Sequence, residues 1–381
     1  LETWRESHQP FHWFLDFYGI MRDGGFDVVI GNPPYVEYRT VRDSYTVQAF
    51  KTLPCGDLYA LVMERGVALL RPGGHIGMIT PVSILGTDGF QPLRDLLLGA
   101  SSETYTQAFA ERPSKLFTGV EKRLAIWIMK AGDGDGRLYA SKYRRWLSEE
   151  RETLFATAAL TEITGLAPLV NRALPKIQTP MERRILEKLS HTSPLGLYAA
   201  KRSRQVVYYT RKVRYFVQFF LTVPRIQDAS GKEVPPSELK ELTFDTDTGR
   251  DVAVAALNSS LFFWFFSAYS DVRNVNRREV EAFPLDLPEA ESQVGARLSE
   301  LATALMADFE RNSTMTKINY QKYGVLTIQV FQPRASKPVI DRIDEALADL
   351  YGFTAEETDF IINHDIKYRL GADASNGTPQ E

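Results

Sequence analysis

Apolar residues near the amino-terminal end form one short run, Phe26 and Val28–Ile30, which predicts a buried strand. Gly31 ends this run, and Asn32-Pro33-Pro34-Tyr35 follows. Proline cannot continue a sheet ladder and restricts the residue before it, so these four residues predict a stiff turn. The turn would hold an amide and an aromatic ring beyond the carboxyl end of a strand, where open α/β sheets bind ligands. An ordinary strand-ending turn is the alternative, because Asn and Pro are common turn residues.

Helical and strand patterns alternate after this turn. Asp57 is a suitable N-cap for a helix with an apolar face that includes Leu58 and Val62, and Pro72-Gly73-Gly74 would end that helix. A second helix is predicted over 85–98, and strands are predicted over 75–81, 104–109 and 122–129. The alternation predicts an α/β fold with a mostly parallel sheet over residues 1–137.

The remaining sequence predicts regions of different character. Mixed charged and apolar positions, followed by three prolines, predict a helical linker over residues 138–175. Residues 176–288 predict an α+β region, and amphipathic patterns predict a helical region over 289–370. The tail 371–381 is rich in Gly, Asn, Ser and Pro and is predicted to be disordered.

The bulk composition narrows the classes of protein only slightly. The 381 residues suggest two or three domains, and the net charge of -3 means that any nucleic-acid surface must be local. The single Cys55 excludes an intrachain disulfide and fits a reducing cytoplasm. The longest apolar run, Leu257–Ala268, is too short to cross a bilayer. The five His residues show no spacing typical of a metal site.

One stretch, residues 201–225, is basic and contains no Asp or Glu. Its cationic residues are Lys201, Arg202, Arg204, Arg211, Lys212, Arg214 and Arg225, and the aromatic residues among them are Tyr208, Tyr209, Tyr215, Phe216, Phe219 and Phe220. Basic side chains bind phosphates and aromatic rings stack on bases, which favours contact with DNA. A solvated sheet face with its aromatic residues in the core is the alternative.

A polar and basic loop follows the aromatic run LNSSLFFWFF, residues 257–266. The loop contains Arg273, Asn274, Asn276, Arg277 and Arg278. Arginine suits guanine edges and asparagine suits adenine edges in the major groove, so this loop is a second candidate for DNA contact.

The sequence GNPPY after an apolar strand resembles the catalytic motif of the N6-adenine DNA methyltransferases. Its surroundings, and the LNSSLFFWFF segment, are similar to Eco57I-type restriction-modification methylases and their target-recognition region. The resemblance implies part of a Rossmann-like (class I) methyltransferase domain, then an α+β target-recognition region and C-terminal helices. It also implies methyl transfer from S-adenosylmethionine to N6 of an adenine flipped out of double-stranded DNA, without a metal, in a restriction-modification or phage-defence system.

The resemblance also implies roles for individual residues. Asn32 and the Pro33 carbonyl would accept hydrogen bonds from the target amine, in a turn completed by Pro34 and Tyr35. Tyr35 would stack on the flipped base, and Phe117 stands where the family has a second stacking aromatic; a core phenylalanine is the alternative. For the cofactor, the matching positions are Asp16 and Val62, and a surface acid is the alternative for Asp16.

The sequence departs from this family in one large respect. No Gly-rich loop that could cradle the cofactor lies upstream of Asn32, so the cofactor half of the domain is expected in a missing amino-terminal half or a separate subunit. Two other functions stay open: a methyltransferase acting on protein glutamine or RNA, and a non-catalytic DNA-binding specificity module. No acid-and-lysine constellation of a nuclease is visible.

Overall fold

The computed structural model describes residues 2–8, 11–44, 46–134, 136–213, 215–236, 238–321 and 323–370. They form two compact units. Unit 1 comprises the described residues of Leu1–Gly165 and Leu174–Thr179, and unit 2 those of Leu166–Ala173 and Pro180–Glu381. The predicted DNA contact Arg214 and the predicted disordered tail lie outside the described residues.

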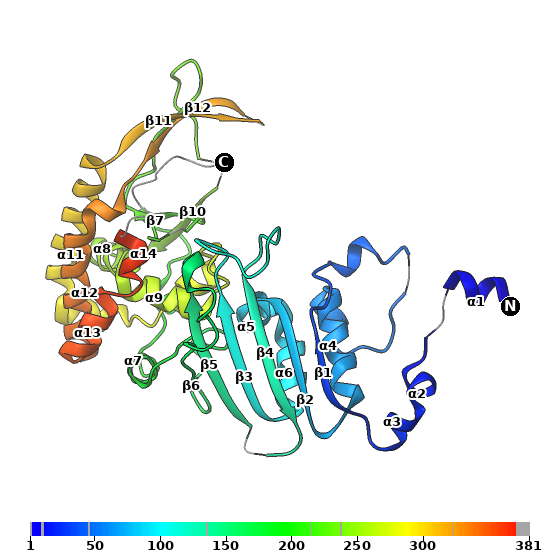
Figure 1. Ribbon diagram of the computed structural model, residues 1–381. Helices are drawn as coiled ribbons and strands as arrows, with labels where there is room; N and C mark the ends of the chain where they lie inside the picture. Colours follow the sequence, from blue (N-terminus) through cyan, green and yellow to red (C-terminus); the bar gives the residue numbers. More distant parts are fainter. Residues whose placement is uncertain are drawn as a thin grey trace. The chain divides into compact units, whose positions relative to one another are not determined.

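Unit 1 alternates helices and strands along the chain (Figure 1). Its elements are α1 (Glu2–His8), α2 (Trp13–Asp16), α3 (Tyr18–Arg22), β1 (Phe26–Gly31), η1 (Tyr38–Thr40), η2 (Leu53–Cys55), α4 (Leu58–Leu69), β2 (Leu70–Pro81), α5 (Ser83–Gly86), η3 (Asp88–Phe90), α6 (Gln91–Gly99), β3 (Ser101–Phe109), β4 (Leu124–Ala131), β5 (Arg137–Arg144), η4 (Ser148–Glu150) and β6 (Thr161–Glu162). The helix after Asp57 is confirmed, and so is a strand at Phe26. The expected burial of this strand is wrong, because β1 lies at the edge of the described sheet and Val28 and Ile30 are 58% and 82% exposed.

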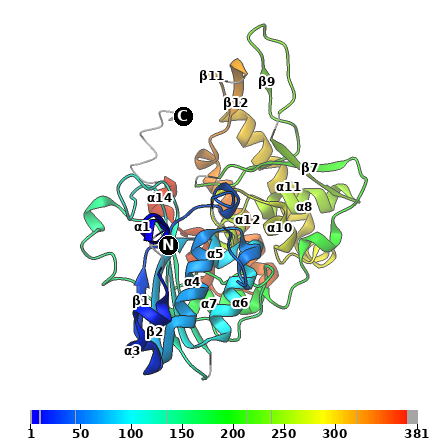
Figure 2. The same ribbon diagram turned by 90° about the vertical axis from the view of Figure 1, so that its right-hand side faces the viewer.

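The sheet of unit 1 has the strand order β1-β2-β4-β3-β5-β6. β1 pairs parallel with β2 and β3 pairs parallel with β5, whereas β4 is antiparallel to both of its neighbours. The fold is therefore mixed α/β: β1, β2, β3 and β5 run in one direction, as expected of a mostly parallel sheet, whereas β4 and β6 run in the opposite direction. The connection from β3 to β4 contains no helix, so β4 returns in the opposite direction. Helices α4 and α6 lie on one face of the sheet (Figures 1 and 2).

The predicted helical linker over 138–175 is also wrong. β5 occupies the start of this segment and pairs with β3, and residues 145–175 contain no α-helix. Leu138, Ala140 and Tyr143 are buried on the core side of β5. A register shift opposite Thr106 and Ala108 interrupts the strict alternation of inward and outward positions. For that reason, the apolar residues of β5 do not follow the two-residue period that would have indicated a strand.

Unit 2 combines helices with two small sheets. Its elements are α7 (Pro180–Leu189), η5 (Leu195–Tyr198), β7 (Gln205–Thr210), β8 (Phe219–Phe220), β9 (Ile226–Gln227), β10 (Leu239–Phe244), α8 (Asp247–Leu257), α9 (Ser260–Tyr269), α10 (Arg277–Ala282), α11 (Leu287–Arg311), β11 (Thr314–Tyr320), β12 (Gly324–Val330), η6 (Pro333–Ser336), α12 (Lys337–Tyr351), α13 (Ala355–Ile362) and α14 (Ile366–Leu370). The sheets have the orders β10-β7-β8 and β11-β12-β9.

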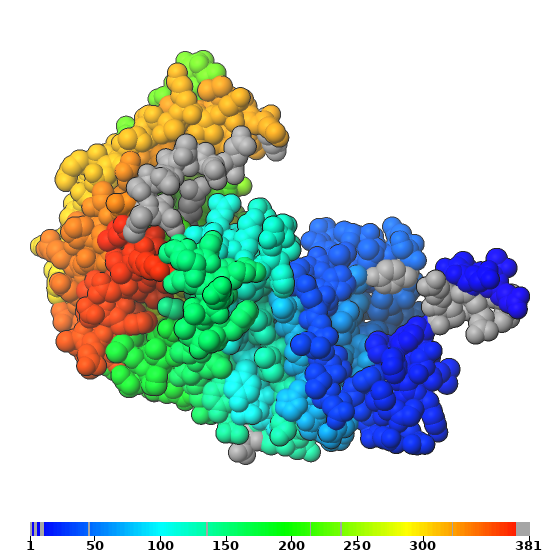
Figure 3. All heavy atoms as spheres, in the orientation of Figure 1, coloured from blue at the N-terminus to red at the C-terminus, as the bar shows by residue number. Residues whose placement is uncertain are grey.

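The aromatic helix α9 lies in the core of unit 2, since all of its residues are buried. Ser259 caps it by accepting a hydrogen bond from the Phe262 amide at 2.9 Å. The predicted helical region 289–370 contains α11 and α12, but also the β11–β12 hairpin, which the sequence interpretation missed. The apolar Met315 and Ile318 of β11 are three residues apart and so lie on opposite faces of the strand, which leaves no simple alternation to reveal it. The hairpin forms the orange arm at the surface in Figure 3.

Within the described part of the chain, no single helix is long and apolar enough to cross a membrane. Among the helices that the structure describes, only α8 and α9 together would meet that length and composition, and they are bent by 65° at their junction.

Candidate active site at the carboxyl end of β1

The Asn-Pro-Pro-Tyr turn begins where β1 ends. β1 lies at one edge of the described sheet, with Gly31 opposite Met78 of β2. Pro33 is buried, whereas Asn32 and Pro34 are exposed. The buried proline anchors the turn to unit 1, and the Asn32 side chain stays accessible to solvent.

The amide of Asn32 contacts the hydroxyl of Tyr35. Tyr35 Oη lies 2.5 Å from Asn32 Oδ1 and 3.1 Å from the carbonyl oxygen of Ile79, so its one proton is donated to either acceptor. Burial raises the pKa of Tyr35 to about 12, which keeps the hydroxyl protonated at neutral pH. An amide oxygen has two lone pairs, so Asn32 Oδ1 can accept a second donor beside Tyr35.

The two predicted base-stacking residues converge on one hydrophobic cluster. Tyr35 and Phe117 are both partly buried and pack against it. The buried members of the cluster are Phe109, Leu116, Leu124, Trp146 and Leu154. The sequence alone could not show this convergence, because it depends on β4 lying between β2 and β3.

An open cavity of about 570 Å³ lies beside the turn. It is lined by Asn32, Pro33 and Pro34 and by the predicted cofactor contact Val62, with further walls from Trp13, Phe50, Leu58, Leu61, Arg65 and Met78. The size is typical of a small-molecule site. Asp16, the other predicted cofactor contact, is exposed and does not line the cavity; its Oδ2 accepts the His12 amide proton at 2.7 Å.

The walls of this cavity fit part of S-adenosylmethionine. The apolar side chains suit one face of a flat adenine ring. The described residues that line the cavity include no acid for ribose hydroxyls, and its glycines, Gly31 and Gly66, lie in β1 and α4 rather than in a glycine-rich loop. The lining therefore fits the adenine and lacks groups for the ribose and methionine parts.

Glu64 of α4 holds the loop that follows the turn, and the sequence interpretation missed this role. Its carboxylate accepts the backbone N–H groups of Lys51 at 3.0 Å and Thr52 at 2.8 Å, and the buried Thr52 hydroxyl at 2.7 Å. Burial opposes ionisation, but these hydrogen bonds outweigh it and lower the pKa of Glu64. The adjacent Phe50 lies under the Arg65 guanidinium, 5.2 Å away, and lines the cavity.

Replacing Glu64 with alanine should lower the free energy of unfolding by about 1–3 kcal/mol, because two amides and a hydroxyl lose a charged acceptor. Since the folded-state pKa is lowered, the Glu64 contribution is complete above its unfolded pKa of about 4.3 and disappears as the pH falls through the folded value. Denaturant unfolding at several pH values measures both effects. The exposed Glu152→Ala is the control, and equal stability of the two variants would contradict this role.

Some of the predicted DNA contacts in unit 2 are exposed, whereas others form hydrogen bonds or ion pairs with residues of the same unit. Lys201, Arg202, Arg204, Lys212 and Arg273 are exposed. Arg211 Nη2 donates to Asn276 Oδ1 at 3.0 Å, and ion pairs link Arg277 to Glu281 at 2.6 Å and Arg278 to Glu279 at 2.7 Å. Of the aromatic residues in this region, Tyr209, Phe219 and Phe220 are core residues. Within the described ranges, no group of three or more His, Cys, Asp and Glu residues is placed to hold a metal ion.

The site combines a mixed α/β sheet with a proline-containing turn and an open cavity at a strand end, which is where open α/β sheets bind ligands. Residues 2–111 match the family model described as "Eco57I restriction-modification methylase", so this part of the chain is similar to the restriction-modification methylases. A curated Methanocaldococcus jannaschii protein, provisionally described as a type II restriction enzyme and methyltransferase, is 36% identical over 78 residues. That match covers 20% of this chain and 6% of the relative.

Two solved structures show more distant similarity. The type IIL restriction-modification enzyme MmeI, determined with DNA, has a TM-score of 0.47 at 9% identity, covering 93% of this chain and 58% of MmeI. A type I restriction-modification methyltransferase subunit from Streptococcus thermophilus has a TM-score of 0.25 at 17% identity, covering 36% of this chain and 34% of that one. The chain thus spans less than two thirds of each relative.

Proposed function

We propose that this chain is the catalytic-loop and target-recognition part of a site-specific DNA methyltransferase that modifies N6 of adenine in a restriction-modification or phage-defence system. One observation carries the proposal: Tyr35 and Phe117 pack on one cluster, and the Tyr35 hydroxyl contacts the exposed Asn32 amide. The proposed location is the cytoplasm, in line with the single Cys55 of the sequence.

The proposed chemistry addresses the weak nucleophilicity of adenine's amine, whose lone pair is delocalised into the ring. The base is flipped out of the duplex and held between aromatic side chains, Tyr35 and Phe117. Asn32 Oδ1 and the Pro33 carbonyl accept the two amine hydrogens, which localises the lone pair on nitrogen. When bound, S-adenosylmethionine supplies an electrophilic methyl group. These residues act by orientation and charge stabilisation, with no strong base required.

Val62 and the apolar walls of the cavity are proposed to hold the cofactor's adenine, and Asp16 to reach it after a movement of α2. The groups for ribose and methionine would come from another part of a longer protein or from a separate subunit. On this account double-stranded DNA contacts unit 2 through the basic residues that the sequence predicts, in a target-recognition region over 176–288.

The isolated chain should bind S-adenosylmethionine weakly or not at all, because its cavity lacks groups for most of the cofactor. Isothermal titration calorimetry of these 381 residues, with the complete gene product as the positive control, measures this directly. Tight binding by the chain alone would contradict the proposed division of the cofactor site.

The incomplete lining of the cavity also favours a second candidate, a DNA-binding specificity module without catalysis. The complete gene product decides between them: sequence-specific DNA binding without cofactor binding or methyl transfer would establish the module. Methyl transfer to a glutamine-containing peptide or to RNA, and not to DNA, would instead establish the third function that the motif allows.

A further inference from the structure

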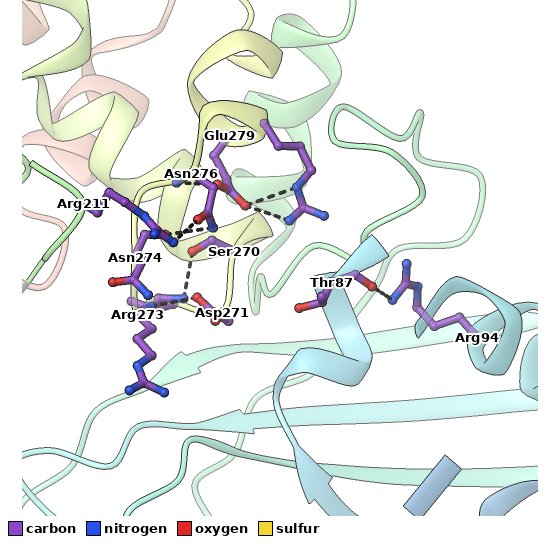
Figure 4. Close-up of polar contacts among 11 residues, drawn as sticks. Thr87, Arg94, Arg211, Ser270, Asp271, Arg273, Asn274, Asn276 and Glu279 are labelled. Atoms are coloured by element: carbon purple, nitrogen blue, oxygen red, sulfur yellow. Dashed lines mark hydrogen bonds and ion pairs between the residues drawn. The ribbon is translucent and has the colours of Figure 1, made fainter. Parts of the chain in front are cut away.

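The loop between α9 and α10, residues 270–276, is held in one shape by hydrogen bonds (Figure 4). Ser270 Oγ accepts the Val272 amide proton at 2.8 Å, and Asp271 Oδ1 accepts the Arg273 amide proton at 2.9 Å. The loop is also joined to the end of β7, since the Val275 amide donates to the Arg211 carbonyl at 2.8 Å. Lys212 and Asn274 form an antiparallel bridge beside it.

Val272 is strained within this loop. Its φ of +56° is in the left-handed region, which a β-branched residue rarely adopts, and its side chain is only 4% exposed. Such a conformation costs about 1–3 kcal/mol and persists only where the surroundings impose it. The chain therefore maintains an unfavourable backbone geometry immediately before Arg273.

Most charged residues beside the loop form hydrogen bonds or ion pairs within unit 2. Arg211 donates to Asn276, while Glu279 receives both the Asn276 amide and the Arg278 guanidinium. Arg277 is paired with Glu281. By contrast, the side chains of Arg273 and Asn274 make no hydrogen bond or ion pair with any residue that the structure describes. Arg273 is exposed, and its guanidinium points away from the other labelled residues of the loop in Figure 4.

We propose that Arg273 and Asn274 read base edges in the DNA target, and that Arg211, Asn276 and Glu279 are positioning residues that fix the loop. The inference rests on the proposed function in requiring a DNA target. A guanidinium offers paired donors to guanine O6 and N7, and an amide offers a donor and an acceptor to adenine N7 and N6. Adjacent in one rigid loop, the two side chains would specify neighbouring base pairs in the major groove.

The test is a binding selection with the complete protein on a library of random duplexes. The wild-type protein should select a defined sequence, and Arg273→Ala should lose the preference at one position, where the correct base was favoured about 5- to 150-fold. Arg273→Lys keeps the charge but loses the paired donors, so it should relax the same position. Asn274→Ala should relax an adjacent position.

The exposed Arg311, which pairs with Asp308 on α11, provides the control variant Arg311→Ala. Its selected sequence should be unchanged, and thermal melting of all variants excludes unfolding as the cause. An unchanged sequence with uniformly weaker binding by Arg273→Ala would make Arg273 a phosphate contact and overturn the inference. Because the selection needs no methyl transfer, a protein that selects a sequence but does not methylate adenine would refute the proposed function separately.

Discussion

Asn32→Ala in the complete protein is expected to reduce the rate of adenine methylation by about 10²- to 10³-fold, the usual effect of removing one preorganised hydrogen-bonding group from a reacting centre. The mutation removes one of the two acceptors proposed for the target amine. The side chain is exposed beside the buried Pro33, so folding should be little affected. Single-turnover incorporation of a labelled methyl group into DNA measures the change.

The exposed Asn363, at the end of α13, offers a matched control for Asn32. Asn363→Ala should methylate DNA at the wild-type rate. DNA binding by Asn32→Ala should remain, because the proposed role concerns the reacting amine. A methylation rate of Asn32→Ala within a few fold of the wild-type rate would show that Asn32 has no catalytic role and would contradict the prediction.

Tyr35→Ala is expected to lower kcat/KM for methylation by about 5- to 150-fold, corresponding to the 1–3 kcal/mol that aromatic stacking contributes per base. Tyr35→Phe separates the ring from the hydroxyl. It keeps the ring on the cluster but removes the hydrogen bond to Asn32 or Ile79, so a loss of only about 2- to 12-fold is expected.

The structure adds a condition to this prediction. Because the Tyr35 ring packs against the cluster that includes Phe109 and Trp146, Tyr35→Ala should also destabilise unit 1. Activity is therefore compared at a temperature where melting curves show both variants to be folded. An equal loss of activity in Tyr35→Phe and Tyr35→Ala would assign the effect to the hydroxyl and contradict stacking.

The elements nearest the turn were predictable because their signals are local. The apolar run at Phe26 gives β1, and the Asp57 boundary gives α4, although the Asp57 side chain makes no capping hydrogen bond. α12 also lies within the helical region predicted over 289–370. In each case apolar spacing and boundary residues agree, so local sequence decides the structure.

The pairing of strands was not predictable, because it depends on contacts between distant residues. Nothing local in β4 shows that it inserts antiparallel between β2 and β3. β5 carries Arg137, Lys142 and Arg144 among its apolar residues, a charge pattern equally suited to a helix. This segment forms a strand because it pairs with β3, and local sequence does not show which strand will be its neighbour.

In the candidate site, too, features marked by local sequence were predicted, whereas contacts between distant residues were not. The motif at Asn32 and the aromatic at Phe117 were found from local sequence, and their convergence on one cluster required the fold. Glu64 was missed because its partners, Lys51 and Thr52, lie in a loop without a regular pattern. The ion pairs of Arg277 and Arg278 could not be predicted from the sequence either. The sequence analysis therefore treated these two residues as DNA contacts of the same kind as the exposed Arg273.

The most direct test of the central claim is to identify the methylated product. The complete gene product is incubated with double-stranded DNA and S-adenosylmethionine, and the DNA is digested to nucleosides for mass spectrometry. The expected product is N6-methyl-2′-deoxyadenosine, which should be absent when the protein carries Asn32→Ala. Methylated cytosine, or methylation confined to a glutamine-containing peptide or RNA, would contradict the central claim.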